Sequence, residues 1–280
     1  MMHAALATQA GSPDSANEDW AGVAAPGLAV VLDGLSAPDG TGTGCRHGTP
    51  WFVSQLGPRL LALASDPARS LVDALAEAIQ QVTSLHPGCD LKHPGTPSAT
   101  MVLLRARDEG ADYLALADAV LLLDTIDGLK VVSDERVNQL AGTEREAANR
   151  VPTGSALKLR RRAQLTRALR RARNRPGGYW VAAADPQAAS QAITGSLPSK
   201  SLHRAVLLSD GASRLADPFK LATWEELLAL LDESGPDELL RQVRAAEAVD
   251  PEGRQWPRTK RSDDATAIYL VLGEDANPQP

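Results

Sequence analysis

The chain has 280 residues, a formal net charge of −6, and 43% hydrophobic and 23% charged residues. This composition is typical of a folded globular protein and excludes a disordered or fibrous chain. The negative charge argues against general affinity for nucleic acid or for an anionic membrane.

The cysteine content and the N-terminal segment indicate the compartment. Cys45 and Cys89 are too few for a disulfide framework, and their spacing does not indicate a zinc cluster. The N-terminus lacks the basic start and apolar centre of a secretory signal, and no apolar run approaches the roughly 20 residues of a membrane helix. We therefore expect a cytoplasmic protein with reduced thiols and no membrane partner.

The first third of the chain predicts a hairpin followed by two helices. Residues 20–33, WAGVAAPGLAVVLD, predict two short strands that turn at Pro26-Gly27. Residues 51–64 and 68–85 place apolar residues at three- and four-residue intervals, as amphipathic helices do. Because Pro67 lies where a second helix should start, two helices are favoured over one. One face of the second helix would carry Leu71, Leu75, Ile79 and Val82.

The middle of the chain predicts strands and then a basic helix. Apolar runs at residues 98–106, 112–125 and 129–134 predict successive antiparallel strands of a meander. Residues 155–175 contain nine basic residues and no acid, with a thin stripe of leucines, and predict a basic amphipathic helix inserted in the domain.

The last third predicts further strands at residues 178–184, 204–210 and 263–272, and two helices within 218–248 that break at SGPDE. Strands joined by short turns, with helices in two clusters, indicate an α+β fold with antiparallel sheets. We expect one domain over residues 1–273 and a polar tail over 274–280.

Acidic residues lie at the ends of several predicted strands. Asp33 and Asp210 end apolar runs, Asp263 precedes one, Asp118 interrupts another, and Asp19 ends an Asn-Glu-Asp motif before the first strand. Each alone suits a turn or a cap. Asp118 within an apolar strand, however, is costly unless it is paired or bound to a cation. Several converging carboxylates favour hard divalent cations such as Mg²⁺ or Mn²⁺.

Six motifs follow one another between residues 8 and 272: NED, VVLDG, SAT, LADAVLLL, LLSDGAS and DDATAIYLV. In this order they resemble the motifs of the metal-dependent protein serine/threonine phosphatases of the 2C type (PPM family), in their bacterial form. The resemblance implies a four-layer αββα sandwich of two antiparallel β-sheets flanked by helices. It also implies a centre of two Mg²⁺ or Mn²⁺ ions at one end of the sandwich.

The resemblance implies a role for each acid. Asp33 would bridge both ions, the carbonyl of Gly34 would bind one ion, and Asp210 and Asp263 would bind the other. The catalytic part would fall to Asp33 and Asp210 through metal-bound water, since two ions about 3.5–4 Å apart lower the pKa of a bridging water that attacks phosphorus.

The resemblance also implies roles for two acids outside the two-ion centre. Asp19 would hold the metal-bound water shell, and Asp118 would help Asp210 to form a looser third metal site. The resemblance thus implies hydrolysis of a phosphate monoester without a phosphoenzyme.

The chain departs from the family's pattern where phosphate should be bound. The family's Asp-Gly-His-Gly-Gly is replaced after Asp33-Gly34 by LSA, and the usual arginine before Asn-Glu-Asp is absent. Arg46 and His47 are candidates for the lost phosphate contact, and packing or helix capping of their loop is an equal alternative. A Cys45 nucleophile lacks a partner acid, and the spacing of the histidines gives no ligand pair.

The basic helix has two open interpretations. Its arginines either form a solvated face or dock an acidic or phosphorylated partner, because guanidinium groups suit phosphate oxygens. Nucleic acid is not expected, because no aromatic residues alternate with the basic ones to stack bases.

Two functional hypotheses follow. The first is a Mg²⁺- or Mn²⁺-dependent phosphomonoester hydrolase that acts on phosphorylated serine or threonine in proteins. The second is a catalytically impaired, phosphatase-like module that regulates or binds phosphoproteins. The surviving acids favour the first, and the missing arginine and the altered loop favour the second.

Overall fold

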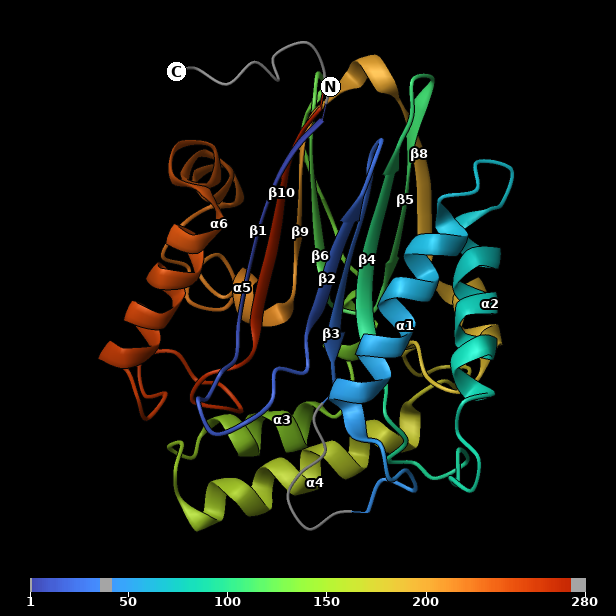
Figure 1. The fold of residues 1–280 in the computed structure, drawn as a ribbon. Coiled ribbons are helices and arrows are strands. Elements are labelled where there is room, and N and C mark those ends of the chain that lie inside the picture. Colours follow the sequence, from blue (N-terminus) through green and yellow to red (C-terminus); the bar gives the residue numbers. More distant parts are fainter. Residues whose placement is uncertain (1, 36–41, 273–280) are drawn as a thin grey trace.

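The computed structural model describes residues 2–35 and 42–272 and places ten strands in two antiparallel sheets (Figure 1). The first sheet has the order β1 (Met2–Gln9), β10 (Ala265–Leu272), β9 (Leu202–Leu208), β6 (Val120–Thr125) and β7 (Gly128–Val132). The second has the order β2 (Trp20–Ala24), β3 (Leu28–Gly34), β4 (Ala99–Ala106), β5 (Gly110–Leu116) and β8 (Ile193–Pro198). The polar tail expected over 274–280 lies outside the described residues.

Helices cover the outer faces of both sheets and one end of the pair (Figure 1). The helices are α1 (Gly48–Ala64), α2 (Leu71–Thr83), α3 (Gly142–Asn149), α4 (Ala156–Ala172), α5 (Asp210–Ser213) and α6 (Trp224–Val249). Short 3₁₀ turns lie at Glu135–Val137, Pro186–Gln191 and Ser199–Ser201. Helices α1 and α2 lie on the second sheet, α6 lies on the first, and α3 and α4 lie across the end where β3 finishes. The four-layer αββα sandwich predicted from the family resemblance is therefore confirmed.

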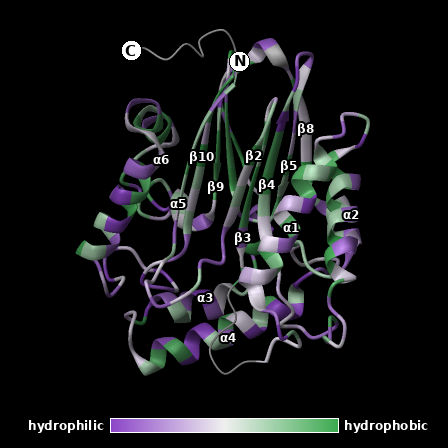
Figure 2. Cartoon of the chain, in the orientation of Figure 1, coloured by the Kyte–Doolittle hydropathy of each residue, from purple (hydrophilic) through white to green (hydrophobic). Residues whose placement is uncertain are grey.

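Strand β3 is covered on both faces, and this explains its continuous apolar sequence. Side chains of a strand point alternately to its two faces. Val30 and Leu32 pack under α1 and α2, whereas Ala29 and Val31 pack between the two sheets. Figure 2 shows hydrophobic residues concentrated along the strands, with hydrophilic ones frequent on α3 and α4. A strand covered on both faces is apolar throughout.

The two predicted helices of the first third are present. Leu71, Leu75, Ile79 and Val82 all lie in one core cluster, as predicted. Helix α2 begins after Ser70, whose side chain accepts a hydrogen bond from the backbone N–H of Asp73. The break predicted in the last third is also confirmed, since Gly235 within α6 has φ 75° and is followed by Pro236.

The run at residues 112–125 is two strands rather than the single strand we predicted. Strand β5 belongs to the second sheet and β6 to the first. Ala117 between them has φ 62°, a left-handed conformation that ends the strand and turns the chain across the sandwich. Asp118 therefore lies in the connection between the sheets and not within a strand.

Other elements also differ from expectation. Residues 178–184 form only isolated bridges, Ala99 with Ala182 and Arg173 with Tyr179, instead of the strand we predicted. Strand β1 was not predicted because it is a mostly exposed edge strand. Strand β8 and helix α3 were not predicted because few of their residues are buried. Within the described ranges, no helix combines the length and apolar character needed to span a membrane.

Candidate metal centre at one end of the sandwich

The ends of β3 and β9 bring two acids together from opposite sheets. Asp33 is the penultimate residue of β3, and Asp210 follows β9 at the start of α5. The backbone N–H of Asp210 donates a hydrogen bond of 2.9 Å to Asp33 Oδ2. The two sequence motifs VVLDG and LLSDG therefore meet at one point.

A pocket at this end of the sandwich contains most of the predicted site residues. Its lining includes Asp33, Gly34, Asp118, Asp210 and Asp263. Asp19 lies close enough to add its charge to that of Asp33, although it is not among the residues that line the pocket. The structure thus gathers the six predicted metal-site residues from β3, α5 and three connections.

The carboxyl groups disturb one another strongly. Burial, together with the charges of Asp210, Asp19 and Asp263, raises the pKa of Asp33 well above its ordinary value. Burial and the charge of Asp263 raise the pKa of Asp210 as well. Negative charges held this close in a poorly solvated pocket call for a cation.

Asp118 and Asp19 show the same effect. Burial, with the charge of Asp210 second, raises the pKa of Asp118 to about 7. Burial raises the pKa of Asp19 to about 7. Among the described residues, no hydrogen bond of normal geometry reaches the buried carboxylate oxygens of Asp19, although the hydroxyl groups of Thr266 and Ser209 lie near enough to lower its pKa. Unsatisfied buried oxygens are a sound reason to expect a cation or its water shell, so the donor set fits a hard divalent ion.

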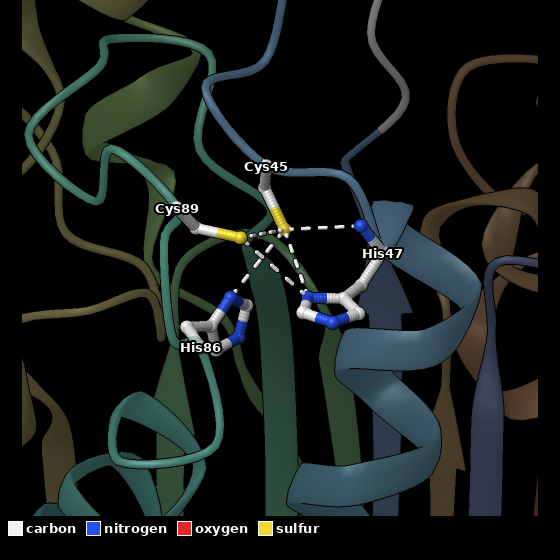
Figure 3. Close-up of side chains that lie close together, drawn as sticks. All are labelled: Cys45, His47, His86 and Cys89. Atoms are coloured by element: carbon white, nitrogen blue, oxygen red, sulfur yellow. Dashed lines mark hydrogen bonds between the residues drawn. The ribbon is translucent and has the colours of Figure 1, made fainter.

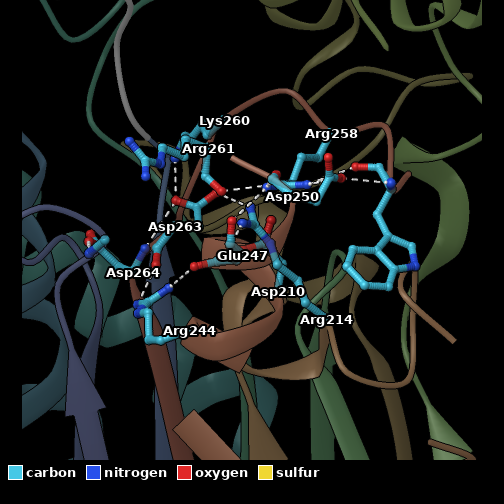
Figure 4. Close-up of polar contacts among 12 residues, drawn as sticks. Asp210, Arg214, Arg244, Glu247, Asp250, Arg258, Lys260, Arg261, Asp263 and Asp264 are labelled. Atoms are coloured by element: carbon cyan, nitrogen blue, oxygen red, sulfur yellow. Dashed lines mark hydrogen bonds and ion pairs between the residues drawn. The ribbon is translucent and has the colours of Figure 1, made fainter. Parts of the chain in front are cut away.

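Asp263 differs because the chain supplies its cations (Figure 4). Lys260 Nζ and Arg214 Nη2 lie 2.5 and 3.1 Å from its two carboxylate oxygens. Burial alone would raise the pKa of Asp263, but Lys260 and Arg214 hold that pKa below its ordinary value. Arg214 in turn pairs with the buried Glu247 of α6 at 2.6 Å. Asp263 is therefore both a pocket acid and part of a buried ion-pair network.

The neighbouring acids and amides of these motifs have positioning roles. Asp264 accepts hydrogen bonds from the backbone N–H groups of Gly11 and Glu18, at 2.7 and 2.6 Å. The side chain of Asn17 accepts one from the N–H of Asp19 at 2.9 Å. Asp19 and Asp263 therefore lie at the carboxylate centre. Their sequence neighbours Asn17 and Asp264 hold the loop of residues 10–19 next to the start of β10.

The glycines after Asp33 and Asp210 are required by close backbone approach. A Cβ on Gly34 would lie 2.3 Å from the carbonyl oxygen of Glu18. A Cβ on Gly211 would lie 1.9 Å from the carbonyl oxygen of Asp264. Because Gly34 has no side chain, the end of β3 can lie against Glu18, next to Asp19. Gly211 in the same way lets the start of α5 lie against Asp264, next to Asp263.

The basic helix forms the opposite wall of the pocket. The lining residues of α4 and the residue that follows it are Arg162, Leu165, Thr166, Leu169, Arg170 and Arg173. Their spacing of three and four residues defines one face of a helix. We predicted the helix but not this wall, and the alternation of leucines with arginines on a single face was the signal that could have indicated it.

Two of these arginines, Arg170 and Arg173, are partly shielded from solvent. Burial lowers the pKa of both Arg170 and Arg173. Arg173 donates to Ser98 Oγ and to the carbonyl of Pro94, at 2.7 and 2.9 Å, and so also supports the fold. Arg145 and Lys260 line the same pocket. A pocket with acids on one wall and guanidinium groups on the other can hold a metal ion together with an anion.

Arg46 and His47, the predicted phosphate contacts, are not among the residues that line this pocket. Arg46 is exposed. His47 Nδ1 lies 3.6 Å from Cys45 Sγ and 3.7 Å from Cys89 Sγ. The structure therefore brings His47 to a separate cluster and not to the carboxylates.

Comparisons with known proteins agree with this architecture. A family model described as protein phosphatase 2C matches residues 9–244. No curated protein sequence matches the chain. Among solved structures, PppA, a key regulatory component of the T6SS in Pseudomonas aeruginosa, shares 18% identity. The similarity covers 97% of this chain and 98% of PppA, with a TM-score of 0.54.

Two further structures show the same fold. The serine/threonine phosphatase Stp1 from Staphylococcus aureus shares 12% identity over 98% of this chain and 96% of its own, with a TM-score of 0.58. The catalytic domain of the serine threonine protein phosphatase PstP, solved with two manganese ions, shares 13% identity over 98% and 99%, with a TM-score of 0.55. Since the family model spans most of the sequence, the chain belongs to the protein phosphatase 2C family of metal-dependent serine/threonine phosphatases.

Proposed function

We propose that this chain hydrolyses phosphate monoesters on serine or threonine residues of proteins, with Mg²⁺ or Mn²⁺ as its cofactor. One observation carries the proposal. The carboxylates of Asp33, Asp118, Asp210 and Asp263 line a single pocket whose opposite wall is basic. Metal ions held by the acids and guanidinium groups of the basic wall could together neutralise the charge of a phosphoryl group.

The acids of the pocket would hold the metal ions. In this proposal Asp33 and the carbonyl of Gly34 hold one ion, and Asp33, Asp210 and Asp263 hold the second. Two bound ions supply an activated water and neutralise charge that develops on the phosphoryl group. Asp33 and Asp210 are thus catalytic through their hold on metal-bound water.

Asp19 and Asp118 complete the set. The unsatisfied buried oxygens of Asp19 suit hydrogen bonds to the metal's water shell. Burial and then the charge of Asp210 raise the pKa of Asp118. A weaker third ion between Asp118 and Asp210 would offset the cost of both charges.

The basic wall would replace the arginine that is missing before Asn-Glu-Asp. We infer that Arg162 and Arg170 of α4 contact the phosphate oxygens, because both line the pocket and guanidinium groups bind phosphate in a forked geometry. The exposed arginines of the same helix, such as Arg160 and Arg167, would attract an acidic segment of the phosphorylated protein. A cytoplasmic location belongs to this proposal, and the free thiols of Cys45 and Cys89 support it.

One observation favours the second candidate, a phosphatase-like module with impaired turnover. Lys260 places an ammonium group on Asp263, one of the carboxylates expected to bind metal. A cation of the chain at this position competes with a metal ion for the same charge. The candidate predicts weak metal binding and slow or absent hydrolysis.

Hydrolysis of a phosphopeptide and of an aryl phosphate, measured with and without Mn²⁺, tests the proposal. We expect Mn²⁺-dependent turnover that Asp33→Asn and Asp210→Asn each reduce by about a hundredfold or more, the scale seen when a group that stabilises transition-state charge is lost. Asp14→Asn, at an exposed acid, is the matched control. No metal-dependent turnover by the unmodified protein would contradict the hydrolase proposal, and weak Mn²⁺ binding in calorimetry would then support the second candidate.

A further inference from the structure

Two cysteines and two histidines converge at a place distinct from the carboxylate pocket (Figure 3). Cys45 and His47 lie in the segment before α1, and His86 and Cys89 lie in the connection after α2. Each offers one ligand atom, and these four atoms all lie within 4.8 Å of one another. His86 is buried, with 7% exposure, and the other three residues are partly buried.

The distances within the cluster are those of a tetrahedron around one ion. Zn–S bonds of about 2.3 Å and Zn–N bonds of about 2.0–2.1 Å in tetrahedral geometry place two sulfurs about 3.8 Å apart and a sulfur and nitrogen about 3.6 Å apart. Cys45 Sγ lies 3.7 Å from Cys89 Sγ and 3.4 Å from His86 Nδ1. His47 Nδ1 lies 3.6 Å from Cys45 Sγ and 3.7 Å from Cys89 Sγ.

Hydrogen bonding alone accounts poorly for this convergence. A thiol has one proton to donate. Cys45 Sγ nevertheless faces Cys89 Sγ and two imidazole nitrogens, and it also accepts from the backbone N–H of His47 at 3.3 Å. A single cation at the centre satisfies the four ligand atoms at once.

The surroundings hold both rings in position. Trp51 of α1 stacks on His47 with ring centroids 4.2 Å apart, and its ring meets His86 edge-on at 4.7 Å. Arg46 Nε donates to Nε2 of His47 at 3.5 Å, so zinc bound at Nδ1, which leaves the proton on Nε2, would require the exposed Arg46 side chain to turn toward solvent. The Nδ1 atoms are therefore presented toward the sulfurs by packing, before any ion binds.

We propose that Cys45, His47, His86 and Cys89 bind a structural Zn²⁺ ion. Two thiolates and two imidazoles select zinc, whereas the hard oxygen donors of the carboxylate pocket select Mg²⁺ or Mn²⁺. The chain provides all four ligands, which is the pattern of a structural site and leaves no position for a substrate.

The ion would anchor a long irregular connection beside the pocket. Residues 84–98 join α2 to β4 without regular structure, and connections longer than about 12–15 residues are uncommon in compact domains unless something holds them. The N–H of Asp90 donates to the carbonyl of Gly44 at 2.8 Å, which is the neighbouring backbone link between the two segments. Gly95 of the same connection lines the carboxylate pocket. Zinc would thus fix one rim of that pocket.

The convergence of these four side chains was not expected from the sequence. Neither the spacing of the two cysteines nor that of the histidines indicates a zinc site. The ligand spacing is Cys-x-His in one segment and His-x-x-Cys in another. Only the packing of α1 against α2 brings the two halves together.

Metal analysis of the full-length protein, purified under reducing conditions with added Zn²⁺ and then freed of excess ion, tests the proposal. We expect one retained zinc per chain, lost in the Cys45→Ser/Cys89→Ser variant and kept in Asp33→Asn, which alters only the carboxylate pocket. Replacement of zinc by Co²⁺ in the unmodified protein should give thiolate-to-cobalt charge-transfer absorption and the visible bands of a tetrahedral ion. This second readout does not depend on the folding of a variant.

Two results would overturn the inference. One is the absence of both retained zinc and thiolate-to-cobalt absorption in the reduced, unmodified protein. The other is a Cys45–Cys89 disulfide in that same preparation. If either result is found while Mn²⁺-dependent hydrolysis persists, the inference fails and the proposed function stands, so the two can fail separately.

Discussion

Asp263 lies between two cationic side chains, which lower its pKa and offset its negative charge. Lys260 and Arg214 pair with its two oxygens, and Arg214 is tied to the buried Glu247. Arg214 has a structural partner of its own, whereas Lys260 lines the pocket directly. Lys260 is therefore the residue whose charge opposes a metal ion most directly.

Removal of this charge should strengthen metal binding. We expect Lys260→Met to lower the Kd for Mn²⁺ about tenfold, or about 1.4 kcal/mol, because a positive group next to a cation site repels the ion. Calorimetric titration measures this change. Arg261→Met, at an exposed neighbouring cation, should leave the Kd unchanged. Weaker binding by Lys260→Met would instead show that Lys260 holds Asp263 in position for the metal.

The two faces of α4 give a matched pair of arginines for the phosphate contact. Arg170 lines the pocket, and Arg167, one turn earlier on the helix, is exposed. We expect Arg170→Ala to reduce kcat/KM for an aryl phosphate about 10- to 100-fold, the value of one hydrogen bond to a charged group. Arg167→Ala should change kcat/KM for an aryl phosphate little. Equal effects of both variants on the aryl phosphate would contradict a specific contact by Arg170.

At the scale of elements, the entry to β10 and the start of α5 pack without space between them. Gly211 of α5 lies against the backbone of Asp264, which precedes β10. Asp210 and Asp263 flank this contact, so their relative position depends on it.

A side chain at this contact should cost stability. We expect Gly211→Ala to lower the free energy of unfolding by about 1–3 kcal/mol or more, because the new Cβ meets a backbone oxygen that cannot move independently of the strand. Urea unfolding measures the change. Gly142→Ala at the start of α3 is the control, since its Cβ would have no neighbour within 4 Å. An unchanged midpoint for Gly211→Ala would mean that β10 can shift without cost.

Several of the elements that the sequence predicted have a strong burial pattern. Strand β3 and helix α2 were readable because the first is buried on both faces and the second has one apolar face. The edge strand β1 is mostly exposed, and its residues carry no such pattern. The run at 112–125 was misread because Ala117, a residue that rarely adopts positive φ, turns the chain between the sheets.

The same distinction applies to the sites. Asp33 and Asp210 could be predicted because each follows its own apolar strand in a motif of a known family. The alternation of leucines and arginines could indicate one face of α4, but not that this face meets the pocket, because the approach of α4 to the sheets is a tertiary contact between segments far apart in sequence. The Cys–His cluster joins two loops in the same way, and His47 accordingly belongs there rather than with the phosphate.

At the scale of the whole molecule, the acids of the pocket link stability to pH. The pKa of Asp19 and of Asp118 is raised to about 7 from an ordinary value of 3.8, mainly by burial. A carboxyl with a higher pKa in the folded chain binds more protons there than in the unfolded chain. Stability therefore falls as pH rises between the two pKa values.

The metal-free protein should accordingly lose stability from about pH 5 to about pH 8. We expect its thermal midpoint to fall over this range, and Asp118→Asn to reduce the fall because it removes one of the responsible carboxyls. Excess Mn²⁺ should raise the midpoint more at about pH 8 than at about pH 5, since fewer protons must leave before the ion binds. Thermal unfolding followed by circular dichroism checks this. A metal-free midpoint that rises with pH across the range would contradict it.

The central claim is that the ends of strands from both sheets form one metal centre. Anomalous diffraction from crystals soaked in Mn²⁺, recorded at the manganese absorption edge, tests it most directly. We predict peaks within about 2.5 Å of carboxylate oxygens of Asp33 and Asp210, one of them also near the carbonyl oxygen of Gly34. Well-ordered crystals with no manganese peak at these three residues would contradict the claim.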